Sequence, residues 1–486
     1  MKNLFDAYQL MDGYDEMFEA QGKPRPHYRQ LFHRLQELTL REFDLKRRQG
    51  DQAFLRQGIT FTVYGDSQQT EKIFPFDLIP RIIPNSEWSL IERGIRQRVL
   101  ALNHFLLDIY TGQKILRDRV VPRRLIESST HFRKDFCGFR PPKDIYIHIA
   151  GIDLVRDHHG TYFVLEDNLR SPSGIAYVLE NRIVMKQLFP DLFSEMRVRP
   201  VDHYPAQLSE NLRFLDPLSR DKPTVVLLTP GVFNSAYFEH SFLSLQMGIK
   251  LVEGRDLIVE GDRVFMKTTQ ELEPIDVIYR RVDDTFLDPE VFRSDSALGV
   301  PGLMRAYRAG NVALANGVGT GVADDKAVYT YVPKMIEYYL SESPILPNVP
   351  TYSCRLKSDL KYVTEHLSSL VVKAVNESGG YGMLMGPSST KAEQAEFKQK
   401  LLANPRDFIA QPLVKLSHHP CVGQNAEGQN QMGGRHIDLR PFALWGQDIT
   451  LSLGGLTRVA LKEGSLVVNS SQGGGSKDTW VLYGEG

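Results

Sequence analysis

The 486-residue sequence contains only three cysteines, Cys137, Cys354 and Cys421, which lie far apart. An odd and widely spaced set argues against a disulfide framework and fits a reducing, cytoplasmic setting. No stretch approaches the roughly 20 apolar residues that a membrane-spanning helix requires, and the first twenty residues carry acids where a signal peptide would be apolar. The sequence therefore excludes a disulfide-rich scaffold and predicts no membrane segment.

An excess of one charge is also missing. Lys and Arg number 58 and Asp and Glu 59, so the formal net charge is −1. A nearly neutral chain has no overall field that attracts nucleic acid or an anionic membrane. Since 42% of the residues are hydrophobic, we expect two or three domains with substantial cores and a size typical of enzymes.

Two common nucleotide-binding motifs are absent as well. The strand-like run PTVVLLTPG (223–231) is not followed by GxGxxG, so a dinucleotide site is not indicated. The phosphate-binding motif GxxxxGK[ST] is missing from the whole chain. Any nucleotide site must therefore be built differently.

The pattern of apolar residues predicts three regions. Residues 1–215 are mainly helical at first, with apolar residues at helical spacing over 86–112, and then show two-residue alternation typical of strands. Asn85 or Ser86 can cap that helix and Gly112 can end it. In residues 222–320, continuous apolar runs predict a small α/β unit with a parallel sheet.

Residues 321–486 combine strand patterns with many glycines. Two segments, 423–434 and 470–476, are rich in glycine and polar residues and predict mobile loops, the second of which could also close over a ligand. No internal repeat is evident.

The most informative segment is GIDLVRDHHGTYFVLEDNLRSPSG (151–174). A two-residue turn at His159-Gly160 would place Asp153 opposite Glu166, with Asn168 on the same face of the hairpin. Facing like charges destabilise a sheet unless a cation neutralises them, and all-oxygen ligands suit Mg²⁺. The alternative is a solvated hairpin edge with the acids splayed apart.

A lysine and a glycine-rich loop follow two hundred residues later. Lys373 lies in the apolar strand LVVKAV, and NESGGYGM then supplies Gly379, Gly380 and Gly382. Backbone N–H groups of such a loop can approach phosphate oxygens, and a strand lysine can reach them as a point charge. An ordinary hairpin turn and a lysine that points to solvent are the alternatives.

Two further segments could contact a nucleotide. The strand DFIAQPLV (407–414) ends at Pro412, and the backbone of such a connector can bind adenine, although a plain edge strand explains it equally well. Lys326 begins a helix that Asp324 or Asp325 would cap. Without context, Lys326 is simply an exposed lysine in a first helical turn.

Taken together, these segments make the chain resemble the circularly permuted ATP-grasp family, which is related to the synthetase part of glutathionylspermidine synthase. In ordinary ATP-grasp enzymes the lysine strand and glycine loop precede the metal-binding acids. Here the acids come first, and this inverted order is the permutation. The segments that carry the resemblance are GIDLVRD with VLEDNLRSPSG, YRRVDD, GVADDKAVYTYVP, VVKAVNESGGYGM and SQGGGSKDTWVL, with YDEMF and PRPHY near the start.

The resemblance implies an α+β and α/β architecture: a permuted ATP-grasp fold, a Rossmann-like domain before the grasp and a helical N-terminal region. It implies ATP and Mg²⁺ as cofactors, with these residues in named roles. The metal ligands would be Asp153, Glu166 and Asn168, the phosphate-binding lysines Lys326 and Lys373, the lid Gly379, Gly380, Tyr381 and Gly382, the adenine hinge Gln411, Leu413 and Val414, and a phosphate-binding arginine Arg458.

The resemblance also suggests where a substrate would bind. Arg280 and Arg281 close the last strand of the middle unit, where α/β sheets usually bind ligands, and one of them could hold a carboxylate or form an ion pair with Asp283 or Asp284. Arg170, Ser171 and Ser173 would hold the acyl substrate. Ser173 could alternatively cap the helix that follows.

The implied activity is that of an ADP-forming carboxylate–amine ligase that works through an acyl-phosphate on a small, peptide-like or glutathione-like substrate. A non-catalytic nucleotide-binding partner protein on the same fold is the alternative. A thiol amidase built on Cys137 with His131 or His148 is a third, and an inert cysteine is the commoner case.

Overall fold

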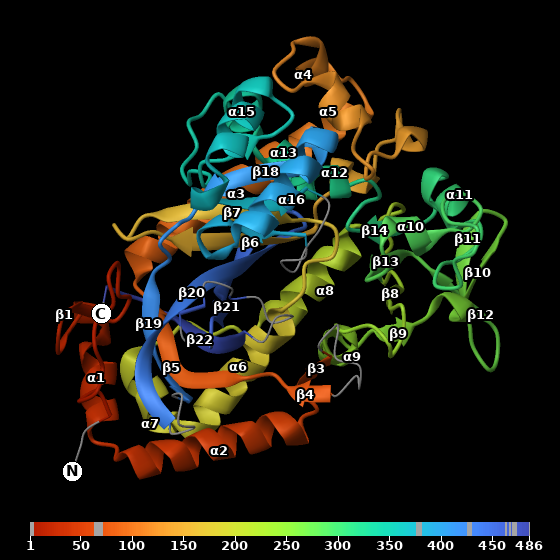
Figure 1. Cartoon of the computed structure of the whole chain (residues 1–486). Coiled ribbons are helices and arrows are strands. Elements are labelled where there is room, and N and C mark those ends of the chain that lie inside the picture. The colour runs from red at the N-terminus through yellow and green to blue at the C-terminus, as the bar shows by residue number, and fades with distance from the viewer. Residues whose placement is uncertain are drawn as a thin grey trace.

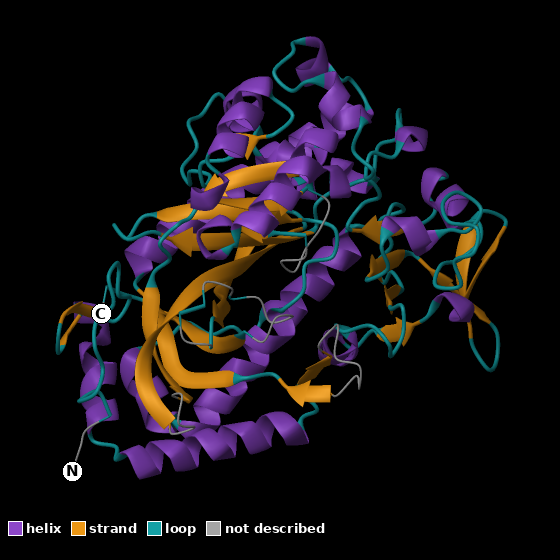
Figure 2. Cartoon of the chain, viewed as in Figure 1, coloured by secondary structure: helices purple, strands orange, loops and turns teal. Residues whose placement is uncertain are grey.

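Helices and sheets alternate throughout the computed structural model, which has a mixed α/β architecture (Figures 1 and 2). None of the helices in the part of the chain that the structure describes has the length and apolar character to cross a membrane. The structure describes residues 4–62, 71–375, 382–424, 430–461, 464–465, 468 and 474–485.

The central sheet joins strands from both ends of the chain. Among the described residues it has seven strands, in the order β5-β22-β21-β20-β6-β7, with β19 also paired to β20. Its pairs are antiparallel except for β22 with β5, which is parallel. The strands are β5 (Phe76–Ile83), β6 (Ile149–Arg156), β7 (Tyr162–Asn168), β19 (His418–Gln424), β20 (Asn430–Trp445), β21 (Ile449–Val459) and β22 (Gly475–Val481).

Both faces of this sheet are covered. On β20, Leu439 and Ala443 belong to the core that includes α3 (Asn85–Tyr110), whereas Phe442 belongs to the core that includes α6 (Ile175–Leu188). Alternate residues of a strand point to opposite faces. The central strands are therefore buried on both sides. Polar side chains on these strands have little access to solvent and need partners within the protein.

A second, smaller antiparallel sheet has the order β15-β18-β16-β17. Helices α15 (Lys357–Glu365) and α16 (Lys391–Ala403) pack beside it, and this unit lies at the top of Figure 1. Its strands are β15 (Tyr352–Ser353), β16 (Leu370–Ala374), β17 (Leu384–Met385) and β18 (Phe408–Pro412). The predicted strand that ends at Pro412 is confirmed.

The middle of the chain forms the predicted parallel sheet, with the order β14-β13-β8-β9. Helices α8 (Tyr204–Phe214) and α9 (Tyr237–Met247) pack against it. Whether this unit is a separate domain, with boundaries at 215–222 and 320, stays a prediction. The strands are β8 (Val225–Leu228), β9 (Lys250–Val252), β13 (Val277–Arg280) and β14 (Ala313–Ala315), and a three-stranded sheet beside them contains β10 (Leu257–Glu260), β11 (Arg263–Lys267) and β12 (Leu272–Ile275).

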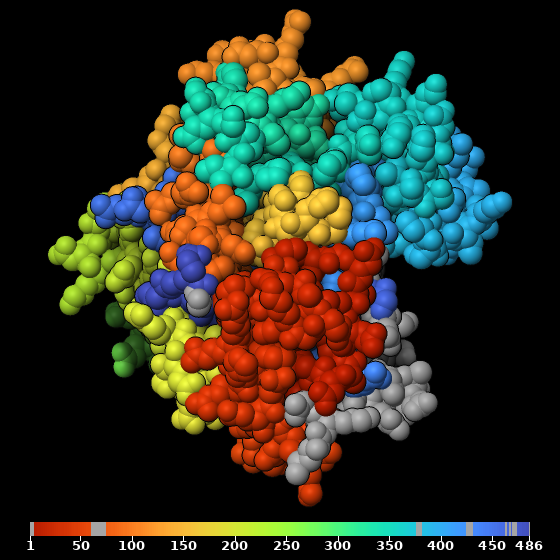
Figure 3. All heavy atoms as spheres, turned by 90° about the vertical axis from the view of Figure 1, so that its left-hand side faces the viewer, coloured from red at the N-terminus to blue at the C-terminus, as the bar shows by residue number. Residues whose placement is uncertain are grey.

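The N-terminal segment covers one side of the molecule (Figure 3). The backbone N–H of Glu16 donates to the carbonyl of His418 on β19 at 2.9 Å, and Tyr28 contacts His419. The remaining elements are β1 (Phe18–Ala20), β2 (Lys23–Pro24), α1 (Arg29–Gln36), α2 (Leu40–Arg56), β3 (Thr60–Thr62), β4 (Glu71–Ile73), α4 (Lys114–Arg117), α5 (Arg123–Glu127), α7 (Pro190–Met196), α10 (Asp284–Leu287), α11 (Leu303–Arg308), α12 (Gly321–Asp324), α13 (Lys326–Tyr329) and α14 (Val332–Leu340).

Three sequence predictions need correction. The long helix begins after Pro84 without a side-chain cap from Asn85 or Ser86; the carboxylate of Glu485 accepts the Ser86 N–H instead. Strand β5 was missed in the region read as helical, because Pro80 interrupts its pattern; an edge strand tolerates proline. The predicted loop 423–434 is wrong at both ends, which belong to β19 and β20, while 425–429 lie outside the described residues.

Candidate functional site

The β6–β7 hairpin brings two acids face to face as predicted. Asp153 pairs with Glu166, and Gly151 with Asn168. The turn, however, is not the predicted two-residue one: the N–H of Asp157 donates to the carbonyl of Thr161, which shifts the first pairs by one residue. A bulge between the pair Leu154–Val164 and the pair Asp153–Glu166 restores the register.

The same face of the central sheet adds two arginines and a third acid. Arg440 on β20 binds Asp153 through Nε at 2.5 Å and Nη2 at 2.8 Å. Arg458 on β21 binds the second oxygen of Asp153 at 2.7 Å and also binds Asp438, its neighbour across the β20–β21 ladder. Burial raises the pKa of Asp153, but the two guanidinium groups outweigh it and hold that pKa below its usual range.

Both predicted lysines lie close to these acids. Lys326 Nζ is 3.4 Å from the Glu166 carboxylate. It begins α13, whose first turn is capped by Asp325, one of the two predicted caps. Two segments about 160 residues apart in the sequence thus meet at Glu166.

Lys373 comes from the second sheet and faces the same group of charges. Its Nζ donates to Gln411 Oε1 at 2.8 Å, and Gln411 Nε2 donates to Thr351. Burial lowers the pKa of Lys373, Glu166 and Asp153 partly offset this effect and Lys326 adds to it, so that the pKa lies at about 8. Within the described residues no acid forms an ion pair with Lys373, and an anionic ligand would stabilise its charged form.

The predicted lid and hinge are only partly described. Gly379, Gly380 and Tyr381 lie outside the described residues, while Gly382 has a positive φ of 64°. Leu413 and Val414 are half-buried and follow the last residue of β18. The strand ladder ends at Pro412, one residue after Gln411, whose side chain binds Lys373.

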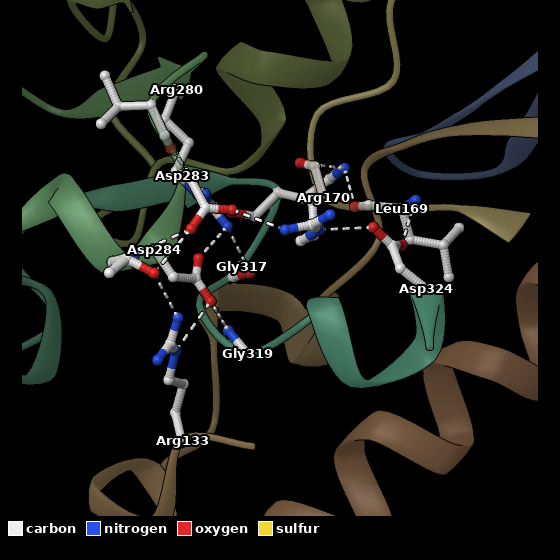
Figure 4. Close-up of polar contacts among 12 residues, drawn as sticks. Arg133, Leu169, Arg170, Arg280, Asp283, Asp284, Gly317, Gly319 and Asp324 are labelled. Carbon is white, nitrogen blue, oxygen red and sulfur yellow. Dashed lines mark hydrogen bonds and ion pairs between the residues drawn. The ribbon is translucent and has the colours of Figure 1, made fainter. Parts of the chain in front are cut away.

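The loop after β7 is fixed by charged groups from three segments (Figure 4). Arg170 donates through Nε to Asp324 at 2.7 Å and through Nη1 to Asp283 at 2.9 Å, and the Leu169 N–H also donates to Asp324. Burial raises the pKa of Asp324 to about 6, although Arg170 opposes this effect. Arg170 is 28% exposed, so a ligand can still reach it.

The two serines of this loop differ from expectation. The carbonyl of Ser173 accepts a long hydrogen bond of 3.3 Å from Arg440, and Ser171 is half-buried. Ser173 does not cap α6; the carboxylate of Glu239 accepts the N–H groups of Gly174 and Ala176. The capping alternative for Ser173 is therefore wrong, and a role for either serine with a substrate stays a prediction.

Arg280 and Arg281 are buried within the parallel-sheet unit. Arg280 donates to the carbonyls of Asn316, Val282 and Gly317 and pairs with Asp284 at 2.6 Å. This is the ion-pair alternative (Figure 4), and both side chains are buried rather than on the surface.

The guanidinium of Arg281 binds Glu239 at 3.0 Å and the carbonyl of Pro172 at 2.9 Å. Both arginines hold protein groups in this structure, and Arg281 links the parallel sheet to the loop after β7. Their predicted contact with a substrate stays a prediction.

The three predicted ligands fit a hard divalent cation by their chemistry. Asp153 and Glu166 are opposed carboxylates, and Asn168 has a buried amide nitrogen that finds no hydrogen-bond partner in the described part of the chain. This unpaired N–H donor calls for an acceptor such as a phosphate oxygen, whereas the amide oxygen of Asn168 is the atom that would bind the cation. The described residues contain no group of three or more His, Cys, Asp or Glu side chains arranged to hold a metal ion, so the predicted set rests on two carboxylates and an amide.

The amidase alternative gains no support. Cys137 is exposed as a residue. Partial burial of its thiol raises the pKa of that group, and the negative charge of Asp135 raises it further. Burial lowers the pKa of His148 to about 3, with a further contribution from Arg280. An activated cysteine needs a lowered thiol pKa, so this cysteine lacks the electrostatic setting of a nucleophile.

Sequence reasoning missed Arg440, Asp438 and Asp324. A signal for the first two was present: they alternate with apolar residues in HIDLRPFAL, a strand that is otherwise apolar. Charges at alternate positions of a buried strand must meet partners on one face. Asp324 had been considered only as a helix cap.

Residues 80–460 match a family model described as circularly permuted ATP-grasp type 2. The chain is 56% identical over 480 residues to an uncharacterized protein of Synechocystis sp., covering 98% of each, and 52% identical over 486 residues to one of Mycobacterium tuberculosis, covering 87% of it. It is 41% identical to a Frankia casuarinae protein named as a candidate glutamate–cysteine ligase, and covers 54% of that protein.

Among solved structures, the fold is similar to that of a glutathione synthetase-like effector from Globodera pallida. The TM-score is 0.57 at 12% identity, with 90% of this chain and 96% of that chain covered. At this identity the likeness concerns the fold alone.

Proposed function

This chain belongs to the circularly permuted ATP-grasp type 2 family and is therefore an ATP-dependent ligase; we propose that it joins a carboxylate to an amine through an acyl-phosphate, with ATP and Mg²⁺. The observation that carries the proposal is the convergence of Asp153 and Glu166, from the first half of the chain, with Lys326 and Lys373 from the second. A triphosphate needs this combination of metal ligands and fixed cations.

Each group has a role in this reaction. Asp153, Glu166 and Asn168 would hold Mg²⁺, which neutralises the phosphates. Lys326 and Lys373 bind phosphate oxygens, and the backbone after β18 contacts the adenine. The substrate carboxylate attacks the γ-phosphorus and ADP leaves. The amine nitrogen then attacks the acyl carbon, loses a proton and expels phosphate. Positioning and electrostatics supply most of the catalysis.

The substrates we propose are small molecules or short peptides with a free carboxylate, together with a small amine. Arg170 supports this proposal because it is part-exposed, lies two residues beyond Asn168, and carries a guanidinium suited to carboxylates; its Nε and Nη1 bind Asp324 and Asp283 in this structure, so a substrate would use its remaining N–H groups or replace one of these acids. The candidate glutamate–cysteine ligase among the relatives is compatible with an amino acid or glutathione-like substrate. A non-catalytic nucleotide-binding partner protein remains the competing proposal.

The test is the substitution Glu166→Ala, assayed for ADP and phosphate release with Mg-ATP and a panel of amino acids, short peptides and polyamines. Turnover should fall at least about 100-fold, since even groups that only orient metal ligands change affinity or activity by 10–100-fold when mutated. Circular dichroism should show that the fold is retained. Glu273→Ala is the control, because Glu273 pairs with a surface lysine, Lys250. Normal ADP release by Glu166→Ala would refute the metal assignment.

Mass spectrometry of any hit then identifies the product. An amide or peptide mass supports the ligase. Tight Mg-ATP binding by the wild type with no ADP release across the whole panel favours the non-catalytic alternative.

A further inference from the structure

Arg440 lies where a cation bound between the two opposed acids would lie. Its Nε and Nη2 grip both oxygens of Asp153 at 2.5 and 2.8 Å, and Nη2 is 4.0 Å from the Glu166 carboxylate. Opposed carboxylates need a positive charge between them. In the structure described here, this charge is a guanidinium of the chain itself.

The backbone is shaped to let Arg440 reach this place. Its stem crosses β6 above Gly151, where an added Cβ would lie 3.2 Å from Arg440 Cδ and 3.0 Å from Pro172 Cβ. A side chain at this position would meet the stem of Arg440, so a glycine keeps its path open. Arg440 is 12% exposed, whereas Asp153 is 1% exposed.

Arg458, the other arginine on Asp153, is less able to leave this acid because a second carboxylate holds it. It is held by Asp438 through Nε, at 2.9 and 3.1 Å to the two oxygens, and through Nη2, while it also binds Asp153. Among the described residues, Arg440 has Asp153 as its close carboxylate partner and otherwise donates only to the carbonyl of Ser173, at 3.3 Å. Of the two arginines on Asp153, Arg440 is the one whose ion pair can be given up.

We propose that Arg440 is an internal counter-ion that occupies the acid pair until a nucleotide arrives, so that free divalent metal binds weakly and nucleotide and metal binding are coupled. The nucleotide phosphates give Arg440 a new anionic partner, and Asp153 with Glu166 becomes open to the metal. This inference rests on the proposed assignment of these acids as metal ligands. It adds a residue that controls when the ligands can be used.

A purely structural role for Arg440 makes the opposite prediction. If the Asp153–Arg440 pair only stabilised the sheet, its removal would lower the melting temperature and leave metal affinity unchanged or weaker. If Arg440 competes with the metal, its removal raises the affinity for metal in the absence of nucleotide, since the binding of one cation then no longer requires displacement of another.

The experiment measures Mn²⁺ binding by the electron paramagnetic resonance signal of free Mn²⁺, with and without ADP, for the wild-type protein and Arg440→Gln. Without ADP, Arg440→Gln should bind Mn²⁺ at least about tenfold more tightly than the wild type, within the usual range of coupling between sites. The stimulation of Mn²⁺ binding by ADP should be large in the wild type and small in the variant.

Two further variants separate the explanations. Arg440→Lys keeps the charge but loses the two-pronged grip, and should fall between the wild type and Arg440→Gln. Arg435→Gln, also on β20, removes an arginine that donates to the carbonyls of Gly434 and Leu461, and should leave Mn²⁺ binding unchanged.

Equal Mn²⁺ affinity of the wild type and a folded Arg440→Gln without ADP would overturn the proposal. Tight Mn²⁺ binding by the wild type without nucleotide would also overturn it. This second test needs only the wild-type protein, so it applies even if Arg440→Gln does not fold. Absence of Mn²⁺ binding in every protein, with or without ADP, would overturn it together with the metal assignment. Coupled binding without amide formation would instead refute only the proposed ligase reaction.

Discussion

The two faces of the β6–β7 hairpin give neighbouring carboxylates different partners and different exposure. Asp167 turns toward α3 and binds Arg98 through two hydrogen bonds of 2.6 and 2.8 Å, with both side chains 1% exposed. Glu166, one residue earlier, is 23% exposed, and its cationic partners in the described part of the chain are Lys326 at 3.4 Å and Arg440 at 4.0 Å. Asp167 is thus fixed by one buried arginine, whereas Glu166, with more distant cations, is the acid of the Asp153–Glu166 pair that a ligand can reach more easily.

The largest expected effect that separates the two faces is on stability. Asp167→Ala leaves Arg98 buried without its carboxylate, and should lower the free energy of unfolding by about 3–5 kcal/mol, as for other broken buried pairs. Glu166→Ala should change it by less than about 1 kcal/mol, because its partners are distant and partly solvated. Urea unfolding of both variants measures the difference; equal losses would mean that both faces are structural.

A smaller effect is expected at the turn that joins the two strands. Gly160 has a φ of 86°, and an added Cβ would lie 2.6 Å from Tyr14 Cε2. Gly160→Ala should cost about 1–3 kcal/mol in unfolding free energy through backbone strain and this clash.

Gly22→Ala is the matched control for the turn. Gly22 has a φ of 70° and no atom within 4 Å of its added Cβ, so it isolates the backbone strain from the clash. Gly22→Ala should cost less than Gly160→Ala in the same urea assay. Equal costs would show that Tyr14 moves aside without loss.

The smallest expected effect concerns Lys373, which lies near Glu166 and Asp153. Free Lys373 loses its proton near its pKa of about 8, and bound phosphates favour the charged form, so binding of ADP should take up a proton. ADP affinity should fall above pH 8, by up to about tenfold per pH unit. Calorimetry at pH 7, 8 and 9 tests this; Lys373→Arg, which stays charged, should show a flat profile. A flat wild-type profile would contradict it.

The same shift has a consequence for stability, with the sign opposite to that for binding. In the unfolded chain Lys373 keeps its proton up to a pKa of 10.5, whereas in the fold it loses the proton near 8. Between these values the unfolded state binds more protons, so this group's contribution to the free energy of unfolding rises with pH.

Much of the site could be predicted from local patterns. Alternating residues on either side of a short turn give a pairing register, and the pairing of Asp153 with Glu166 is confirmed. A two-residue turn alone does not produce this pairing, because the real turn shifts the register by one residue and a bulge shifts it back. Neither the turn type nor the bulge has a clear signature in HHG or VLED, since both depend on what packs against the strands.

Other features could not be predicted because their partners are distant in the sequence. Arg440 reaches Asp153 across 287 residues, and Asp324 meets Arg170 across 154. Strand β5 pairs with β22 at the other end of the chain. Local propensity carries no information about such neighbours.

By itself, the amino-acid sequence determined the residue types, the spacing of acids, lysine strand and glycine loop, and the alternation that builds each strand, because these are properties of short segments. Only the tertiary structure decided which acid is paired by Arg98 and which stays open, and that two arginines of later strands lie on Asp153. The physical reason is that a charge acts on whatever lies within a few ångströms of it, and the fold alone decides what that is.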